Sequence, residues 1–417
     1  MSDLFDRARS IIELNDKGTF TVPTHGLYPF QWNWDSGFAA LGFSHFDQSR
    51  AFVELETLLA HQWPDGMVPH IIFHEEDDGY FPNTDVWQTD RPTPTSGITQ
   101  PPVAGFILHT LFQRAGAAYA DRTRALVEKI HRWHTWFYDV RGQDGLVAIV
   151  HPWESGRDNS VDWDAAFERV PTEGVQPFQR RDVQHADPAH RPTDEQYKRY
   201  IWLVQQFRSL GWDNQAIAQQ STFQVVDPWF NAILIRSCAA IAELAAQLDM
   251  DQIAQQSADM ASQAIESLER LWSEPAQQYV CFDRVLGVAV NNAAVGGLLP
   301  VIVDLPPQRA EQLAQTITHK ANNSRYTVAS QPVDSDHFDA LRYWRGPIWL
   351  IVNHMIATGL REHGHAAVAE RIEQDSLSLI EQGGFAEYYG PHAGEPCGGE
   401  TFTWTAAIVL ELLAGRG

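Results

Sequence analysis

The chain has 417 residues, 44% of them hydrophobic and 20% charged, which is the composition of a globular protein with a substantial core. Lys and Arg total 30 against 53 Asp and Glu, and the formal net charge of −23 argues against nucleic acid or an anionic membrane as a partner. The 3 cysteines, Cys238, Cys281 and Cys397, are too few and too far apart for a disulfide framework or a zinc site, so neither a metal nor another cofactor is expected.

The N-terminal segment MSDLFDRARSIIELNDKG is predicted to form a charged amphipathic helix. It has no apolar core and no small-residue cleavage site, so it does not resemble a signal peptide. The most apolar segment, from Pro228 to Leu248, contains Arg236 and Glu243 and has a polar face, which indicates a helix of a soluble protein. We therefore expect a cytoplasmic protein, and the sequence leaves open whether it forms a homo-oligomer.

Helical periodicity dominates the chain, and its clearest example follows the start signal Asp227-Pro228. Short strand candidates occur at Leu146–Val150 and Gln278–Asp283, but they are too scattered to build a central sheet. We therefore expect an all-α protein. Its helices are predicted, in chain order, near residues 2–15, 47–61, 101–115, 121–139, 194–210, 228–248, 250–272, 288–300, 306–320, 346–361, 363–382 and 402–414.

Helices of similar length joined by alternately short and long connectors fit a toroid of helix pairs, an (α/α)6 barrel with inner and outer rings. The length could hold two domains, but a helical barrel of this size closes around one core, so we expect a single domain over residues 1–417. The long connectors carry most of the Trp, His, Asp, Pro and Gly residues, and we expect them to form a pocket at one end of the barrel. They lie near residues 16–34, 62–100, 141–160, 171–193, 321–346 and 383–401.

Two of these connectors place carboxylates among aromatic and glycine residues: HPWESGRDNSVDWD at 151–164 and GGFAEYYGPHAGEPCGGETFTWTAA at 383–407. Hydrolysis of a glycosidic bond requires such a pair, because one acid protonates the leaving oxygen while a second carboxylate activates water or attacks directly. The 15 tryptophans suit a pocket that stacks against sugar rings, although each could equally be a core residue. Taken alone, each acid could also be a helix cap or a loop hydrogen-bonder.

Together with YPFQWNWDSGFAALG at 28–42, SGITQPP at 96–102 and YWRGPIWLIVNHMIATGL at 343–360, these segments resemble glycoside hydrolase family 63 over nearly the whole chain. The resemblance implies that Asp158, in the ESG-x-DNS loop, is the general acid. It implies that Glu387, in the E-x-Y loop near the C-terminus, is the general base. From the residues themselves, Glu154 would raise the pKa of Asp158 by like-charge repulsion, and Arg157 would oppose this rise if it pointed inward.

The large members of that family carry an N-terminal β-sandwich that is absent here, so the chain resembles the short bacterial subgroup of glucosylglycerate and mannosylglycerate hydrolases. The segment ADPAHRPTDEQYKRY at 186–200 supports this subgroup, within a lid-like insertion at about 171–200. The resemblance implies that Arg191 and Tyr197 bind the glycerate carboxylate. The expected reaction is hydrolysis, with inversion, of a small α-glycoside, 2-O-α-glucosylglycerate or mannosylglycerate. Loss of Arg191 should then spare neutral substrates.

Further pocket residues are expected from the same motifs. Asp35 in WNWDSG is a helix N-cap on local grounds, and the resemblance makes it a ligand for sugar hydroxyls flanked by stacking rings. Arg345 could instead form a structural salt bridge beneath the pocket. The full set of additional substrate-binding candidates is Trp32, Trp34, Asp35, Gln100, Trp344, Arg345 and Trp349.

Other functions remain compatible with the residues. An α-glucosidase acting on a neutral disaccharide would use the same two acids. A sugar isomerase or epimerase on the same barrel would use a histidine pair, and the chain has 17 histidines. A non-catalytic sugar-binding protein would have no use for both carboxylate loops. The spacing of His70 and His74 before Glu75 could bind a cation, but a solvated loop face explains it as well.

Overall fold

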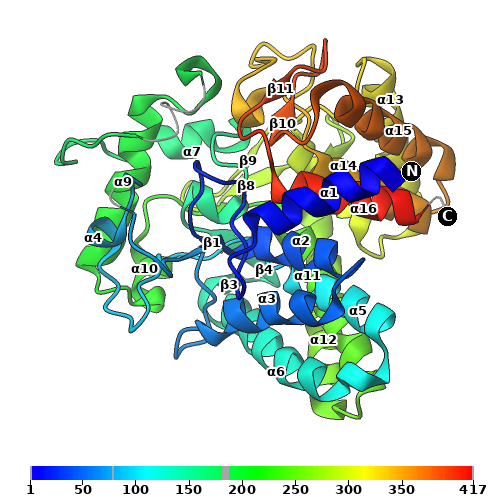
Figure 1. Cartoon of the computed structure of the whole chain (residues 1–417). Coiled ribbons are helices and arrows are strands. Elements are labelled where there is room, and N and C mark those ends of the chain that lie inside the picture. The colour runs from blue at the N-terminus through cyan, green and yellow to red at the C-terminus, as the bar shows by residue number, and fades with distance from the viewer. Residues whose placement is uncertain (1, 78, 181–186, 416–417) are drawn as a thin grey trace.

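Helices make up most of the computed structural model, which describes residues 2–77, 79–180 and 187–415 (Figure 1). The α-helices are α1 (Ser2–Asn15), α2 (Asn33–Phe43), α3 (Gln48–Ala60), α4 (Thr84–Trp87), α5 (Ala104–Ala115), α6 (Ala120–Trp136), α7 (Asp164–Glu168), α9 (Asp194–Ser209), α10 (Asn214–Gln220), α11 (Pro228–Gln247), α12 (Asp251–Leu268), α13 (Pro307–Asn322), α14 (Leu350–Glu362), α15 (Ala366–Gly383) and α16 (Thr403–Ala414). The prediction of a mainly helical protein is confirmed.

Short helical turns of other types complete the helical part. Phe137–Arg141 (η2) is a π-helical turn at the end of α6. The remaining turns are of the 3-10 type: η1 (Ala117–Tyr119), η3 (Pro152–Ser155), η4 (Val161–Trp163), η5 (Pro188–His190), η6 (Glu269–Leu271), η7 (Val295–Ile302) and η8 (Tyr343–Arg345).

Six inner elements form a closed circuit of contacts: α2 packs on α5, α5 on α11, α11 on η7, η7 on α14, α14 on α16, and α16 returns to α2. Each inner element is also covered from outside. The outer helix α1 packs on α16 and α2, α3 on α2 and α5, α6 on α5 and α11, α12 on α11, α13 on η7, and α15 on α14. Along the chain, outer and inner elements therefore alternate.

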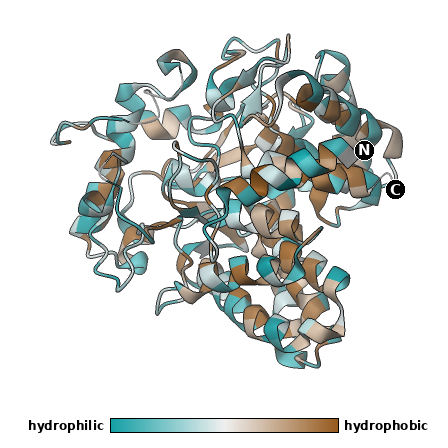
Figure 2. Cartoon of the chain, viewed as in Figure 1, coloured by the Kyte–Doolittle hydropathy of each residue, from teal (hydrophilic) through white to brown (hydrophobic). Residues whose placement is uncertain are grey.

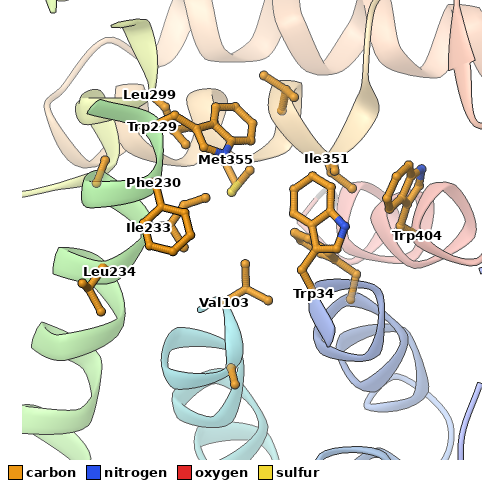
Figure 3. Packing of buried hydrophobic residues seen from close by; sticks show 14 of the residues in the cluster. Trp34, Val103, Trp229, Phe230, Ile233, Leu234, Leu299, Ile351, Met355 and Trp404 are labelled. Carbon is orange, nitrogen blue, oxygen red and sulfur yellow. The ribbon is translucent and has the colours of Figure 1, made fainter. Parts of the chain in front are cut away.

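The hydrophobic core lies between these two layers and inside the circuit. Helix α11 contributes most of its length to it, beginning at Pro228 behind Asp227, whose side chain accepts a hydrogen bond from the backbone N–H of Trp229. Figure 3 shows side chains from α2, α11, η7, α14 and α16 converging, among them Trp34, Phe230 and Met355. The outer helices are amphipathic, as their mixed colouring in Figure 2 shows.

One described helix, α11, is long and apolar enough to span a membrane by length and composition. In this fold 67% of its most apolar stretch is buried inside the protein, which is how a core helix behaves.

The first strand candidate and the second half of the other meet in one small antiparallel sheet, which the expectation of scattered strands did not include, while Gln278–Tyr279 pairs elsewhere. Residues Leu146–Ile149 (β4) pair with Val225–Val226 (β5), which in turn pairs with Cys281–Asp283 (β8). The sheet has the order β3-β4-β5-β8-β9, with Gly142–Gln143 (β3) and Val288–Val290 (β9) at its edges. Two-stranded pairs are formed by β1 (Gln31–Trp32) with β2 (Ile71–Ile72), β6 (Trp272–Ser273) with β7 (Gln278–Tyr279), and β10 (Tyr388–Tyr389) with β11 (Pro396–Cys397).

The helix predicted at 288–300 is wrong. Its first three residues form the edge strand β9, residues 291–294 are irregular, and the part from Val295 onward belongs to the 3-10 segment η7, which contains Pro300. Proline lacks the backbone N–H that a continuing α-helix would need. The predicted helices do not include α2, which follows strand β1 directly, although the N-cap interpretation of Asp35 already implies a helix at this point.

Candidate active site

A pocket opens near the N-terminal ends of three inner helices, α2, α5 and α16. It collects residues from the start of α2, the segment before α5, the loop after β4, the segment before α9, η8 and the start of α16. The predicted residues that line it are Trp32, Trp34, Asp35, Gln100, Asp158, Arg191, Tyr197 and Glu387. It is further lined by Pro23, Leu27, Tyr28, His70, Ile71, Tyr80, Phe81, Pro82, Trp153, Gly156, Pro192, Tyr343, Phe402 and Trp404.

Asp158 is held in the pocket wall by its backbone. Its carbonyl oxygen accepts a hydrogen bond from the Tyr200 hydroxyl at 2.9 Å and another from Trp163 Nε1 at 3.1 Å. The next residue, Asn159, is buried and accepts the backbone N–H of Trp344 at 2.9 Å. Asp158 itself is partly exposed between buried neighbours, so the loop presents this carboxyl group to the pocket.

The two charged neighbours of Asp158 point elsewhere. Arg157 is fully buried and pairs with Asp162 at 2.7 Å and with Asp227 at 2.9 Å, at the start of α11. Glu154 lies 3.6 Å from Arg141 and accepts the backbone N–H of Val150 at 2.8 Å. Neither side chain lines the pocket.

Glu387 is almost fully buried, with 1% of its surface exposed, and four groups surround its carboxylate. The hydroxyls of Tyr28 and Tyr343 donate to Oε1 at 3.2 and 3.3 Å, and the backbone N–H of Gly399 donates to Oε2 at 3.2 Å. Arg191 Nη1 lies 3.7 Å from Oε2. Glu387 is therefore fixed from several directions before any substrate binds.

Burial raises the pKa of Glu387, and the Arg191 guanidinium is the main group that opposes this rise. Arg191 also donates to the Tyr28 hydroxyl at 2.8 Å and lies over the Tyr343 ring, 4.1 Å from its centroid. The predicted carboxylate-binding arginine is thus part of the immediate surroundings of Glu387. Tyr197 also lines the pocket, where its hydroxyl donates to the backbone carbonyl of Phe81 at 3.3 Å.

Asp35 is not the N-cap of α2, because the helix begins at Asn33 and Trp32 occupies the extended N-cap position. Asp35 therefore lies in the first turn, where the helix dipole favours a negative charge. Burial raises the pKa of Asp35, and the nearby charge of Glu387 raises it further. Gln100 supports the same turn by accepting the backbone N–H of Trp34 at 3.2 Å.

Aromatic rings form much of the remaining wall. Trp32 meets Tyr28 and Tyr80 edge-on, with centroid separations of 5.3 and 5.6 Å. Trp153 packs at 5.8 Å from Tyr197. Several of these rings were not selected from the sequence, although all but Tyr80 and Phe81 lie inside the quoted motifs. The unselected rings are Tyr28, Tyr80, Phe81, Trp153, Tyr343, Phe402 and Trp404.

Trp344, Arg345 and Trp349 do not line the pocket, which corrects their selection as substrate-binding residues. The two tryptophan rings stack on each other with centroids 3.9 Å apart and planes at 3°, and both are 1% exposed. Arg345 instead pairs with Asp164, with Nη1 2.9 Å from Oδ2, so its structural salt-bridge interpretation applies. These three residues support the segment from which Tyr343 reaches Glu387.

The histidines do not form a catalytic pair at this site. Among the described residues that line the pocket, His70 is the single histidine, and burial lowers its pKa well below the usual value. His74 hydrogen-bonds Gln31 at 2.7 Å and stacks on Phe20. In the described parts of the chain, no group of three His, Cys, Asp or Glu side chains is arranged to hold a metal ion.

The geometry suits acid–base chemistry on a small polar ring. It combines a partly exposed carboxyl group at Asp158, a buried and preoriented carboxylate at Glu387, and aromatic walls. Two carboxyl groups in one pocket can protonate a leaving oxygen and activate a water molecule.

Comparison with known proteins agrees with this chemistry. Residues 28–405 match the mannosylglycerate hydrolase MGH1-like glycoside hydrolase domain. The chain is 44% identical over 412 residues to the mannosylglycerate hydrolase of Thermus thermophilus, covering 97% of this chain and 99% of that protein. It is 33% identical over 441 residues to the glucosylglycerate hydrolase of Mycolicibacterium hassiacum, covering 99% and 98%.

The similarity extends to three dimensions. The crystal structure of a family 63 mannosylglycerate hydrolase from Thermus thermophilus, in complex with Tris and D-glycerate, matches with a TM-score of 0.94. That match has 44% sequence identity and covers 98% of this chain and 99% of the other.

Proposed function

The chain belongs to the mannosylglycerate hydrolase MGH1-like glycoside hydrolase family, and from this membership we propose that it hydrolyses mannosylglycerate or glucosylglycerate to a free hexose and glycerate. The protein is a glycoside hydrolase. The observation that carries the proposal is the pocket that holds Asp158 and Glu387 together with Arg191, since it joins a pair of acids to a cation for an anionic aglycone.

In the proposed reaction, Asp158 donates its proton to the glycosidic oxygen as the bond between that oxygen and the anomeric carbon breaks. Glu387 removes a proton from a water molecule as the water oxygen attacks the anomeric carbon from the opposite side. The products are a hexose with inverted anomeric configuration and glycerate carrying the proton from Asp158. The hydrogen bonds from Tyr28, Tyr343 and Gly399 support this role, because they orient Glu387 without requiring it to move.

The anionic aglycone is proposed to lie near Arg191 and Tyr197. A guanidinium can form two parallel hydrogen bonds to a carboxylate, and this is strongest where water is excluded. Arg191 is only 5% exposed and lines the pocket, which supports the assignment.

The test is a hydrolysis panel of mannosylglycerate, glucosylglycerate, glucosylglycerol, kojibiose and trehalose with Asp158→Asn and Glu387→Gln as variants. We expect release of hexose from at least one glycosylglycerate, with the β-anomer formed first as seen by proton NMR. Each variant should lose nearly all turnover while keeping its fold, because neither acid mainly serves packing. A first-formed α-anomer, or near wild-type activity in either variant, would contradict the mechanism.

The circuit of inner elements with its outer helices supports the finer proposal of an (α/α)6 barrel in which η7 takes the place of one inner helix. We further propose a single domain over 1–417 with a lid-like segment at about 171–200, of which residues 181–186 lie outside the described residues. A cytoplasmic location is proposed from the low cysteine content, and formation of a homo-oligomer is compatible with the sequence.

A further inference from the structure

Tyr200, on α9, is not part of the pocket lining, yet it contacts the loop that carries Asp158 at two separate points. Its hydroxyl donates to the backbone carbonyl of Asp158 at 2.9 Å. Its own backbone carbonyl lies 3.1 Å from Nε2 of His151, at the other end of the same loop. One residue of α9 therefore holds both ends of the segment from His151 to Asp158.

The protonation state of His151 is determined by its partners. Nδ1 accepts the backbone N–H of Trp153 at 3.1 Å, so the ring proton must be on Nε2, which donates to Tyr200. Burial lowers the pKa of His151 to about 3, so the ring stays neutral and this link persists at ordinary pH.

Packing makes the link rigid. Tyr200 has no exposed surface, and its ring stacks on Phe167 with centroids 4.8 Å apart and lies 5.1 Å from Trp153. The same helix carries Tyr197 into the pocket, one turn before Tyr200. Helix α9 thus joins a residue of the proposed aglycone site to the backbone of the proposed acid.

We propose that Tyr200 is a positioning residue for the general acid: its hydroxyl fixes the carbonyl of Asp158, and this sets the direction in which the Asp158 carboxyl group meets the glycosidic oxygen. The inference rests on the proposed role of Asp158. A displacement of a fraction of an ångström is sufficient to weaken proton transfer, because the donor and the leaving oxygen must be within hydrogen-bond distance.

The experiment compares two substrates that differ in their need for the acid. Glycerate leaves as an alkoxide unless Asp158 protonates it, whereas fluoride leaves from an α-glycosyl fluoride without protonation. Tyr200→Phe removes only the hydroxyl, and we expect kcat on the glycosylglycerate to fall about tenfold while kcat on the matching glycosyl fluoride changes less than about twofold. A purely structural role would lower both rates together.

Tyr279→Phe is the matched control. Tyr279 is also fully buried, and its hydroxyl donates to Glu269 at 2.7 Å outside the pocket lining, so both rates should stay at the wild-type level. If Tyr200→Phe leaves both rates unchanged, or lowers both equally, the positioning role is refuted. If Tyr200→Phe fails to fold, Trp163→Phe removes the second donor to the same carbonyl and must show the same selective loss.

Asp158→Asn separates this inference from the proposed function. If Asp158 is the acid, this variant loses glycosylglycerate hydrolysis and retains glycosyl fluoride hydrolysis. Equal loss on both substrates would refute the acid role itself, whatever Tyr200→Phe shows. Selective loss in Asp158→Asn with equal loss in Tyr200→Phe would refute the positioning role alone.

Discussion

The surroundings of Glu387 make its protonation sensitive to one neighbouring charge. Burial raises its pKa, and Arg191, with Nη1 3.7 Å from Oε2, limits that rise. As the proposed base, Glu387 works only when it is deprotonated. We therefore expect Arg191 to contribute to the hydrolysis of neutral as well as acidic substrates, which differs from the expectation that its loss would spare neutral ones, and kinetics of an Arg191 variant would decide between the two predictions.

Arg191→Met should move the acidic limb of the pH profile to higher pH. Without the guanidinium the pKa of Glu387 rises further, so a larger fraction of the enzyme carries a protonated base at any given acidic pH. We expect a shift of about 1 pH unit, the effect typical of one opposite charge at this range. The profile of kcat/KM should be measured with an α-glycosyl fluoride, which depends neither on glycerate binding nor on Asp158.

Arg345→Met is the control for that measurement. Arg345 is buried to a similar degree but pairs with Asp164 outside the pocket, so its loss should leave the acidic limb in place. An unchanged limb in Arg191→Met, or an equal shift in both variants, would show that Arg191 does not set the protonation of Glu387.

Position 398 requires glycine because its backbone lies against the Glu387 side chain. A Cβ at this position would lie 2.2 Å from Glu387 Oε2, and the backbone φ of +74° is one that side chains rarely adopt. We expect Gly398→Ala to lower kcat by about 100-fold or more, because Glu387 would have to leave its hydrogen-bond donors. Steady-state kinetics together with thermal unfolding would check this.

Gly287→Ala provides a matched comparison, since Gly287 has a φ of +69° but open space around its Cβ position. It should show a stability loss of about 1 kcal/mol from the backbone strain and full activity. Comparable activity in the two variants would mean that Glu387 tolerates displacement.

At the level of elements, most of the longer helices could be predicted from the sequence, including the largely buried α16, whereas the bounds of α2 could not. The predicted segments near 2–15 and 306–320 match α1 and α13, which each bury one face. All residues of α2 are buried, so the segment lacks the alternation of polar and apolar faces every 3.6 residues that indicates a surface helix. The sheet was missed because β4, β5 and β8 have two to four residues each and pair across long sequence separations without a local turn signal.

For the candidate site, the motifs predicted which loops form the pocket. They did not predict which side chains of those loops point into it. The motifs around Asp158 and Glu387 lead to the pocket, as do Trp32, Trp34, Asp35 and Gln100. In the segment YWRGPIW, however, Tyr343 faces Glu387 while Trp344 and Trp349 stack behind it. The chain there is an irregular 3-10 turn, so no simple period indicates which ring faces inward.

At the level of the whole molecule, the circuit of inner elements brings Asp35 and Glu387 close to helix N-termini, where the backbone favours negative charge. Asp35 lies in the first turn of α2, and Glu387 lines the same pocket as Trp404, which belongs to the first turn of α16. Helix N-termini stabilise nearby anions modestly, which partly offsets the repulsion between closely placed carboxylates.

Net charge should make the reaction depend on salt for acidic substrates only. A chain of charge −23 repels a glycosylglycerate at long range, and this repulsion reaches about 30 Å at 0.01 M salt but about 8 Å at 0.15 M. Contacts inside the pocket, where Arg191 is 5% exposed, are screened much less, so added salt should mainly remove the repulsion.

We expect kcat/KM for the glycosylglycerate to rise roughly two- to fivefold over this range, and kcat/KM for neutral glucosylglycerol to stay constant. The two substrates should be measured in parallel at fixed pH with sodium chloride. A fall in kcat/KM confined to the acidic substrate would mean that cations around the pocket mouth, rather than the total charge of the molecule, govern the approach of the anion.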